Sequence, residues 1–571
     1  MKKLMIGNEA IARGAYEAGI KVVSSYPGTP STEITEFVAG YDEIYAEWAP
    51  NEKVAMEVAA GASVAGVRTM VCMKHVGMNV AADPMFTFAY TGVNGGAVIV
   101  VADDPGMHSS QNEQDSRFYA RSAHIPMLEP SDSDEARRFV KTACEISERY
   151  DTPVILRTTT RLAHSQSTVT FGERVETETK PYVKDITKYA MMPASAIKRH
   201  LAVEARENRL KAEQDKLNLD EIHIKGKDFG VVCSGVVYQY VKEALPDASV
   251  YKVGMVYPLN VEAIRKFSES VKELIVIEEL EPFFENQLKA NGIVCSGKDK
   301  TGLQGELNVN KIKKAVYGFE ENKPLSDLPV RPPMLCAGCP HRSVFFVLNK
   351  LGCTVTGDIG CYTLGAQPPL RAIDTVLCMG ASVSMAHGFE KALGRENTKN
   401  QVAVIGDSTF IHSGITGLIN AVYNKSNITL VILDNRTPGM TGHQDNPATG
   451  KTLKGERTYE LDFVTLAKAL NVPSVVQVGA YDLKLLEETI KGELNKDCVS
   501  VIVVKQPCVL LDKSKKPFLR IDGCVGCKRC MKLGCPAMSL DDTGRAVIDK
   551  TVCVACGVCK DMCKVGAIKE A

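Results

Sequence analysis

Eight cysteines in two short runs near the carboxyl end restrict the possible fold of this chain more than any other feature. In each run two residues separate successive members of the first three cysteines, and a fourth cysteine follows shortly after. The first run comprises Cys524, Cys527, Cys530 and Cys535. The second run comprises Cys553, Cys556, Cys559 and Cys563. Two such runs so close together indicate a domain built around metal ligands.

The spacing of the runs predicts two [4Fe–4S] clusters, because three closely spaced thiolates bind one cluster and the fourth cysteine binds the cluster of the other run. The expected ligands of cluster 1 are Cys524, Cys527, Cys530 and Cys563. The expected ligands of cluster 2 are Cys553, Cys556, Cys559 and Cys535. A zinc ribbon would pair cysteines two at a time, and a disulfide framework suits small secreted domains. Lys564 stands where proline usually follows such a run, but this residue shapes a turn and binds no iron.

Composition places the rest of the chain among ordinary globular proteins. Its 571 residues are enough for about three to five domains. Lys plus Arg and Asp plus Glu number 68 each, which indicates neither nucleic-acid binding nor a membrane-binding surface. No apolar stretch is long enough to cross a bilayer, no signal peptide is recognisable, and the 19 cysteines favour a reducing compartment. We therefore expect a cytoplasmic protein, and the iron–sulfur chemistry suggests an anaerobic or microaerobic host.

Short apolar runs that alternate with longer amphipathic stretches predict an α/β fold with parallel, helix-covered sheets. The expected strands are residues 95–103, 152–158, 229–235, 273–279, 401–407, 428–435 and 499–506. The clearest helices are expected at residues 133–150 and 482–496.

Polar and proline-containing segments divide the chain into four expected domains. These are residues 1–195, 228–325, 334–512 and 515–571. The charged stretch 196–227 is expected to be a solvated helical linker, and segments 321–333 and 511–520 are expected to be further linkers.

The third domain carries polar residues where two buried strands end. Gly406, Asp407 and Ser408 end one expected strand, and Asn435 ends the next, with Thr437 shortly after it. The carboxyl ends of parallel strands form the ligand-binding edge of a doubly wound sheet. Asp407 and Asn435 offer the oxygen ligands that Mg²⁺ prefers, and the helix that begins between them can face a diphosphate. Because short motifs match freely, strand ends without a special function are the alternative interpretation.

The order of these elements resembles the thiamin diphosphate motif, in which Gly-Asp-Gly at one strand end precedes an asparagine-bearing strand end. Ser408 replaces the last glycine of that motif. In this resemblance Asp407 and Asn435 bind Mg²⁺, and Gly406, Ser408 and Thr437 join them in contacting the cofactor.

Two segments of the first domain resemble 2-oxoacid:ferredoxin oxidoreductases. The segment NEKVAMEVAAGASVAGVRTMV (51–71) resembles a helix in which an acidic residue precedes small ones. In that resemblance Glu52 is the carboxylate that activates thiamin diphosphate, and Glu57 is the competing candidate. The segment YPGTPSTEI (26–34) resembles the Y-P-x-T-P-S/T segment, which places Thr29 at the substrate or cofactor. A proline-rich turn that opens a helix is the alternative interpretation of that segment.

Over essentially its whole length, the chain resembles the α subunits of indolepyruvate:ferredoxin oxidoreductases. The resemblance implies, in chain order, a pyrimidine-type thiamin diphosphate domain, a transketolase C-terminal-like domain, a diphosphate-type domain and an α+β bacterial-type 2[4Fe–4S] ferredoxin domain. It implies that an aryl 2-oxo acid, such as indolepyruvate or phenylpyruvate, and CoA give an aryl-acyl-CoA and CO₂ while ferredoxin is reduced. Thiamin diphosphate would serve as the electron sink during decarboxylation.

A further set of cysteines is comparable in position to the ligands of a third cluster in related oxidoreductases. The set comprises Cys336, Cys339, Cys361 and Cys508. A third [4Fe–4S] cluster next to the cofactor is one interpretation. Buried free cysteines, which are common in protein cores, are the other.

The resemblance also implies a partner, because the family's remaining domain has no counterpart in the four segments. We therefore expect a β subunit in an α2β2 assembly, with ferredoxin as the electron acceptor. The nearest alternative keeps the chemistry and changes the substrate to a branched-chain 2-oxo acid or 2-oxoglutarate. A thiamin-dependent decarboxylase without redox chemistry is a second alternative.

Overall fold

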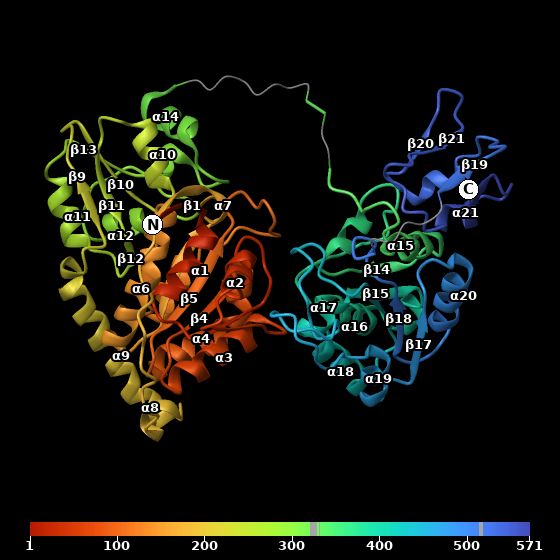
Figure 1. Cartoon of the computed structure of the whole chain (residues 1–571), viewed down its shortest axis with the longest axis horizontal. Helices are drawn as coiled ribbons and strands as arrows, with labels where there is room; N and C mark the ends of the chain where they lie inside the picture. Colours follow the sequence, from red (N-terminus) through yellow and green to blue (C-terminus); the bar gives the residue numbers. More distant parts are fainter. Residues whose placement is uncertain (320–327, 330–331, 513–517, 571) are drawn as a thin grey trace. The chain divides into compact units, whose positions relative to one another are not determined.

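The computed structural model describes residues 1–319, 328–329, 332–512 and 518–570, and the chain forms two compact units, Met1–Asp327 and Leu328–Ala571 (Figure 1). Most of the expected linker 321–333 and half of 511–520 lie outside the described residues. None of the described helices is both long and apolar enough to cross a membrane. All 19 cysteines are described, and none forms a disulfide.

The first unit is built on a seven-stranded sheet with the order β12-β6-β7-β5-β4-β2-β3. All neighbours run parallel except β12 and β6. The strands are β2 (Val22–Ser25), β3 (Tyr45–Trp48), β4 (Thr69–Lys74), β5 (Ala97–Asp103), β6 (Met127–Leu128), β7 (Val154–Thr159) and β12 (Met255–Tyr257). Strands β4, β5 and β7 are buried at every residue, as expected for a sheet covered on both faces.

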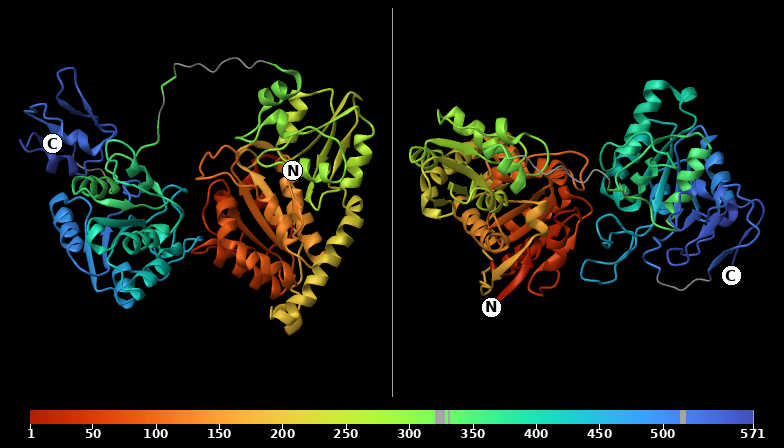
Figure 2. Two further views of the ribbon diagram at one scale, coloured as in Figure 1. Left: turned by 180° about the vertical axis from the view of Figure 1, so that it is seen from behind. Right: turned by 90° about the horizontal axis from the view of Figure 1, so that it is seen from above.

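Helices cover both faces of this sheet (Figures 1 and 2). One layer contains α1 (Gly7–Glu17), α2 (Thr32–Val38) and α6 (Ser133–Tyr150). The other contains α3 (Glu52–Val64) and α4 (His75–Thr91), with α5 (Arg117–Ala123) next to α4. Helix α6 matches the expected helix in both bounds, and the carboxylate of Asp132 caps it by accepting from the N–H of Glu135. A small antiparallel pair, β1 (Lys2–Ile6) and β8 (Gln166–Thr170), and α7 (Thr160–His164) complete this part.

A four-stranded sheet, β13-β10-β11-β9, belongs to the same unit. Its strands are β9 (Glu221–His223), β10 (Phe229–Ser234), β11 (Ser249–Val253) and β13 (Glu273–Val276). The accompanying helices are α10 (Val237–Ala244), α11 (Val261–Ser268), α12 (Phe283–Ala290), α13 (Lys298–Thr301) and α14 (Val309–Tyr317). Apolar residues of this part and of the seven-stranded sheet form one core, and β12 joins the larger sheet directly. The first two expected domains therefore pack as one body.

The charged stretch expected to be a solvated linker is docked on this body instead. It contains α9 (Pro193–Glu213), which α8 (Ile186–Tyr189) precedes and the 3₁₀ turn η1 (Gln214–Leu217) follows. Helix α9 buries Val203 and Leu210, and its Arg206 donates to the carbonyl oxygen of Asp151. The overall charge concealed this narrow apolar face, whose two members lie seven residues apart.

The second unit contains a five-stranded parallel sheet, β14-β15-β16-β18-β17. Its strands are β14 (Thr354–Thr356), β15 (Gln401–Gly406), β16 (Thr429–Asp434), β17 (Ser474–Val478) and β18 (Ser500–Lys505). Helices α15 (His341–Lys350) and α20 (Leu483–Leu494) cover one face, and α16 (Ala381–Leu393), α18 (Ile415–Tyr423) and α19 (Phe463–Ala469) cover the other. Alternate residues of β15, β16 and β18 enter the two cores, as the strand period of two requires.

The carboxyl-terminal tail packs on the α15 and α20 face and shares its core (Figure 2). It consists of two antiparallel pairs and two short helical segments. The pairs are β19 (Leu519–Ile521) with β22 (Ile568–Glu570) and β20 (Met538–Leu540) with β21 (Ala546–Ile548). The helical segments are η5 (Arg529–Leu533) and α21 (Val558–Met562).

Backbone contacts fix the tail to the body of the second unit. The Arg342 guanidinium donates to the carbonyl oxygens of Leu533 and Gly534 at 3.0 and 2.6 Å. Gly338 has φ of +68°, and a Cβ there would lie 2.1 Å from a methyl carbon of Val554. Glycine is therefore required where the body meets the tail.

Candidate active site

Acidic and amide side chains meet at the carboxyl edge of the five-stranded sheet. Asp407 follows β15 directly, Asp434 ends the neighbouring β16, and Asn435 comes next. All three side chains are buried. The expected metal-binding residues therefore lie on adjacent strand ends, where ligands bind in sheets of this kind.

Two buried carboxylate oxygens at this edge have no hydrogen-bond donor in the described part of the chain. They are Oδ2 of Asp407 and Oδ1 of Asp434, although the latter lies 3.7 Å from Nε of Arg436 in an ion pair. The other oxygen of Asp407 accepts from the backbone N–H of Ser408 at 2.6 Å. Burial, and next the charge of Asp434, raise the pKa of Asp407 to about 7. A divalent cation would offset both the burial of Asp407 and its repulsion from Asp434. This pair therefore fits Mg²⁺, which takes a few protein oxygens and completes its shell with phosphate oxygens.

His341 orients the amide of Asn435, a role that sequence reasoning did not assign. Its Nε2 accepts from Nδ2 of Asn435 at 3.4 Å. Burial lowers the pKa of His341 to about 4, so the ring is neutral and can accept near pH 7. The amide oxygen of Asn435 has one long contact, 3.4 Å from the N–H of Thr437. That oxygen is the one expected to bind the metal.

The helix that follows Asp407 contains a π-helical turn. Residues Asp407–Thr409 form α17, Phe410–Gly414 form the π turn η4, and α18 continues from Ile415. The turn buries the side chain of His412, whose Nδ1 lies 2.9 Å from the hydroxyl of Ser413. π turns inside helices occur frequently at functional sites.

A second unassigned residue, Asp358, fixes the loop between β14 and α16. Its carboxylate is fully buried and accepts from the N–H groups of Ile359, Gly380 and Ser382 at 2.8, 2.9 and 3.0 Å. Burial raises its pKa to about 6 in spite of these donors. This loop continues into the 3₁₀ turn η2 (Cys361–Ala366), so Asp358 positions Cys361.

The four cysteines of the expected third cluster share one neighbourhood. Burial, and next the thiols of Cys336 and Cys508, raise the pKa of Cys361 to about 11. The pKa of Cys339 rises to about 12 because the thiol is buried and because the thiols of Cys336 and Cys508 lie nearby. The structure thus brings together Cys361 and Cys508, which lie 147 positions apart in the sequence. For Cys353 the pKa is raised by burial, and for Cys378 by burial and the charge of Asp358, without a contribution from these four cysteines.

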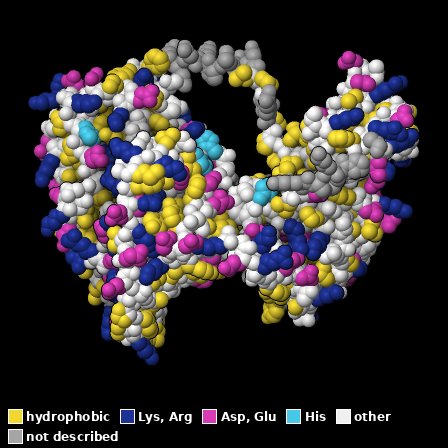
Figure 3. Space-filling model, in the orientation of Figure 1, with side chains coloured by type: hydrophobic (Ala, Val, Ile, Leu, Met, Phe, Trp, Pro, Cys, Tyr) yellow, Lys and Arg dark blue, Asp and Glu magenta, His cyan; other side chains and the backbone are white. Residues whose placement is uncertain are grey.

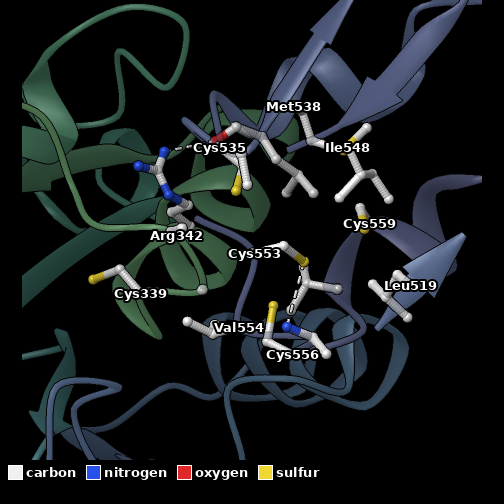
Figure 4. A pocket seen from close by; sticks show the side chains of 16 residues that line it. Cys339, Arg342, Leu519, Cys535, Met538, Ile548, Cys553, Val554, Cys556 and Cys559 are labelled. Carbon is white, nitrogen blue, oxygen red and sulfur yellow. Dashed lines mark hydrogen bonds between the residues drawn. The ribbon is translucent and has the colours of Figure 1, made fainter. Parts of the chain in front are cut away.

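The eight tail cysteines line two cavities, each shared by both runs. One cavity is lined by all four expected ligands of cluster 2, together with Gly338, Cys339 and Arg342 of the body (Figure 4). The other is lined by all four expected ligands of cluster 1 and by tail residues alone. The backbone N–H groups of Ala546, Ala555 and Ala567 lie 3.2–3.4 Å from cysteine sulfurs, as donors near cluster sulfurs do.

Within the described residues, no three His, Cys, Asp or Glu side chains are grouped as they would be around one metal ion. A cubane cluster binds one thiolate at each iron, so its ligands surround a volume instead of converging on a point. Each cavity is lined by three cysteines of one run and the fourth cysteine of the other run. This arrangement is therefore the observation that fits two clusters.

In the first unit, the two competing glutamates of α3 occupy different environments. Glu52 is buried at the first turn of the helix, and a Cβ on Gly77 of α4 would lie 2.5 Å from its Oε1. Glu57 is exposed and forms an ion pair with Lys53. Glu57 therefore behaves as an ordinary surface carboxylate, whereas Glu52 is enclosed at the edge where the strands end.

Thr29 lies at the same edge, beside a buried lysine that sequence reasoning overlooked. Lys74, the last residue of β4, donates from Nζ to the carbonyl oxygen of Ser109 at 2.6 Å. The hydroxyl of Ser109 in turn donates to the carbonyl oxygen of Thr29 at 3.3 Å. Burial lowers the pKa of Lys74 to about 8, and the charge of Asp104 opposes that shift. His75 is buried next to Lys74.

Two family profiles match the chain. One, described as "Pyruvate flavodoxin/ferredoxin oxidoreductase, thiamine diP-bdg", matches residues 13–220. The other, described as "Thiamine pyrophosphate enzyme, C-terminal TPP binding domain", matches residues 358–504. The first match extends through α9, in agreement with the docking of that helix.

Curated relatives match over nearly the whole chain. An indolepyruvate oxidoreductase subunit IorA from Archaeoglobus fulgidus is 39% identical over 100% of this chain and 98% of its own length. The subunit of the same name from Thermococcus kodakarensis is 40% identical over 99% of this chain and 96% of its own length. A solved 2-oxoglutarate:ferredoxin oxidoreductase from Magnetococcus marinus is 19% identical, with a TM-score of 0.48, over 56% of this chain and 65% of that one.

Proposed function

The chain belongs to the family of indolepyruvate oxidoreductase subunits IorA, and from this premise we propose the reaction that it catalyses and the parts that its residues play. It is the catalytic subunit of an indolepyruvate:ferredoxin oxidoreductase. In the proposed reaction an aryl 2-oxo acid loses CO₂, its acyl carbon forms a thioester with CoA, and the thiol proton is released. The two electrons that leave reduce ferredoxin, one electron at a time.

The observation that carries this proposal is that Oδ2 of Asp407, at the strand edge, has no hydrogen-bond donor among the described residues. The chain in which it lies is related to IorA throughout its length. Asp407 and Asn435 would bind Mg²⁺, and the metal would hold the diphosphate of thiamin diphosphate. Gly406, Ser408 and Thr437 would line the same cofactor. When bound, thiamin diphosphate supplies the electron sink that decarboxylation requires.

In the first unit, Glu52 would donate a hydrogen bond or proton to the aminopyrimidine and thereby favour the active tautomer of the cofactor. Its burial against Gly77 of α4 fits this role, because close packing holds the carboxyl group in one orientation at the edge where the cofactor would lie. Thr29 would contact the substrate or cofactor at the same edge.

The proposed electron path follows the order of the cysteine sets. Cys336, Cys339, Cys361 and Cys508 would hold a third cluster next to Asn435. Cys339 and Gly338 line the cavity of cluster 2, so this cluster would receive electrons from the third one. Cluster 1, whose cavity is lined by the tail alone, would be the last centre before ferredoxin.

The name of the relatives, a subunit, implies a partner chain. We propose a β subunit in an α2β2 assembly and a cytoplasmic location, to which the 19 unpaired cysteines are suited.

Anaerobic viologen reduction, with the chain alone and with its β partner, tests the proposed function. The substrates would be indolepyruvate, phenylpyruvate, a branched-chain 2-oxo acid, pyruvate and 2-oxoglutarate, each with and without CoA and thiamin diphosphate. We expect CoA-dependent reduction that is fastest with the aryl acids. Faster reduction with another acid would reassign the substrate, and CO₂ release without viologen reduction by a preparation with intact clusters would indicate a decarboxylase.

A further inference from the structure

The part of the tail around the cluster 1 ligands is open to solvent. Cys527 is exposed, and the side chains of Val525 and Val565 are 64% and 55% exposed. Both valines line the cavity of the cluster 1 ligands. Exposed apolar side chains directly over a redox centre are a feature of surfaces that bind another protein.

A groove of about 1100 Å³ adjoins this surface, between the tail and helices α15 and α20. Arg529 and Met562 line both the groove and the cluster 1 cavity, so the two are continuous. Apolar side chains of the groove come from body and tail alike: Phe346, Val347, Pro369, Leu370, Leu483 and Met562.

Cations outnumber anions in the groove. Five cationic and three anionic side chains line it, and one of the anions, Glu487, is already paired with Lys350 and Lys491. Arg529, Lys532 and Lys564 are exposed and form no ion pair with any residue that the structure describes. Lys528, also exposed and unpaired within those ranges, lines the cluster 1 cavity.

We propose that this groove, with the cationic residues Lys528, Arg529, Lys532 and Lys564, is the docking site of a small acidic electron-carrier protein. The inference rests on the proposed function, because it takes cluster 1 as the exit of the electron path. Unpaired cations attract an acidic partner and raise its rate of encounter, while the small apolar surface allows rapid release. In each encounter one electron leaves reduced cluster 1 and reduces the oxidised centre of the carrier, without any proton transfer.

The test compares two double variants of the α/β holoenzyme that make the same change of charge. Lys532→Glu with Lys564→Glu alters the groove. Arg545→Glu with Lys550→Glu alters exposed tail residues that line neither the groove nor the cavity. The measurements are the Kd of an oxidised acidic 2[4Fe–4S] ferredoxin by calorimetry, its KM during turnover, and the rate of viologen reduction, at low and high ionic strength.

We expect the groove variant to raise Kd and KM by about tenfold or more at low ionic strength, with little effect at high salt, and to retain viologen reduction. The control variant should change each constant less than about twofold. The proposal is overturned if the groove variant binds ferredoxin like the wild type, or if the control weakens binding equally. If the proposed function is wrong, the wild-type enzyme will reduce no viologen. The Kd values of ferredoxin for the groove and control variants would still decide whether the groove is the docking site.

Discussion

The backbone N–H of Cys508 donates to the carbonyl oxygen of Asn435 at 2.9 Å. One residue belongs to the expected third cluster and the other to the expected metal site. This contact would hold the proposed third cluster close to the proposed metal and diphosphate site, so loss of the cluster should affect turnover without moving Asn435.

Cys508→Ser keeps this backbone contact and removes one thiolate. We expect the variant to lose one [4Fe–4S] cluster per chain and to lose 2-oxo-acid-dependent viologen reduction, while it still binds thiamin diphosphate. Iron analysis and electron paramagnetic resonance of the reduced protein measure the clusters. Cys378→Ser, at an exposed cysteine outside the set of four, is the control and should keep all clusters. A full cluster content in Cys508→Ser would show that the thiolate of Cys508 is not required to hold a cluster.

Glu52→Gln and Glu57→Gln distinguish the two glutamates of α3. Glu52→Gln should lower the turnover number by roughly 10²- to 10⁴-fold, the contribution typical of a general acid or base, with little change in the Kd of thiamin diphosphate. Glu57→Gln should have nearly wild-type turnover because its side chain is exposed and paired with Lys53. The measurement is steady-state viologen reduction together with a cofactor titration. Normal turnover in Glu52→Gln would exclude Glu52 as the activating carboxylate.

Much of the fold could be predicted from sequence because buried parallel strands are continuous apolar runs. The runs expected at 401–407, 428–435 and 499–506 correspond to β15, β16 and β18, with ends that differ by at most one residue. Strand β2 (Val22–Ser25) was missed because it has four residues and ends in two serines. Its pairing with β3 and β4, and not its own composition, makes it a strand.

The residues of the candidate site also fall into two groups, those that the sequence indicates and those that only the folded chain brings together. Asp407 and Asn435 stand in recognisable positions at strand ends, so the sequence pointed to them. The contact between His341 and Asn435 joins residues 94 positions apart, and only the packing of α15 against the sheet creates it. Lys74 gave no signal, because one lysine after an apolar run is normally exposed and here a loop that includes Ser109 covers it.

Asp407→Asn tests the metal site by a change of one atom. The affinity for thiamin diphosphate in the presence of Mg²⁺ should fall sharply in this variant. Loss of an outer-shell partner costs roughly 10- to 100-fold in metal affinity, and loss of a direct ligand should cost more. Removal of a buried charge beside Asp434 should leave the melting temperature of the cofactor-free protein unchanged or higher. Calorimetric titration and thermal melting measure the two effects. Asp462→Asn, at the exposed cap of α19, is the control, and unchanged cofactor affinity in Asp407→Asn would refute the metal assignment.

Gly338→Ala tests how the tail is held against the body. The added Cβ would meet Val554, which lies between two expected ligands of cluster 2, so we expect slower electron transfer into the tail and slower ferredoxin reduction. Gly523→Ala, in the tail, has φ of +73° and no atom within 4 Å of the new Cβ, so it carries the same backbone strain without the collision. Stopped-flow absorbance after mixing with substrate measures cluster reduction. Equal rates in the two variants would mean that this contact does not control the transfer.

Glu279 should make the stability of the chain depend on pH. It is buried after β13 and accepts from the N–H of Leu307 at 2.8 Å, and burial raises its pKa to about 7. Between the unfolded pKa near 4.3 and the folded value near 7, the unfolded chain releases this proton first. The stability that the raised pKa contributes is therefore fully present below pH 4.3 and is lost as the pH rises toward 7, by at most about 4 kcal/mol.

Glu279→Gln removes this titration and keeps an acceptor for Leu307. The variant should therefore gain stability relative to the wild type as the pH rises from 5 to 7, and the difference should level off above about pH 8, where the wild-type carboxyl is ionised in both states. Melting temperatures measured across this range, on chains with the same cluster content, follow the difference. Glu269→Gln, at an exposed residue after α11, is the matched control and should give a difference that does not change with pH. A constant difference for Glu279→Gln as well would mean that Glu279 is ionised in the folded chain throughout, with the charge of Arg157 offsetting its burial.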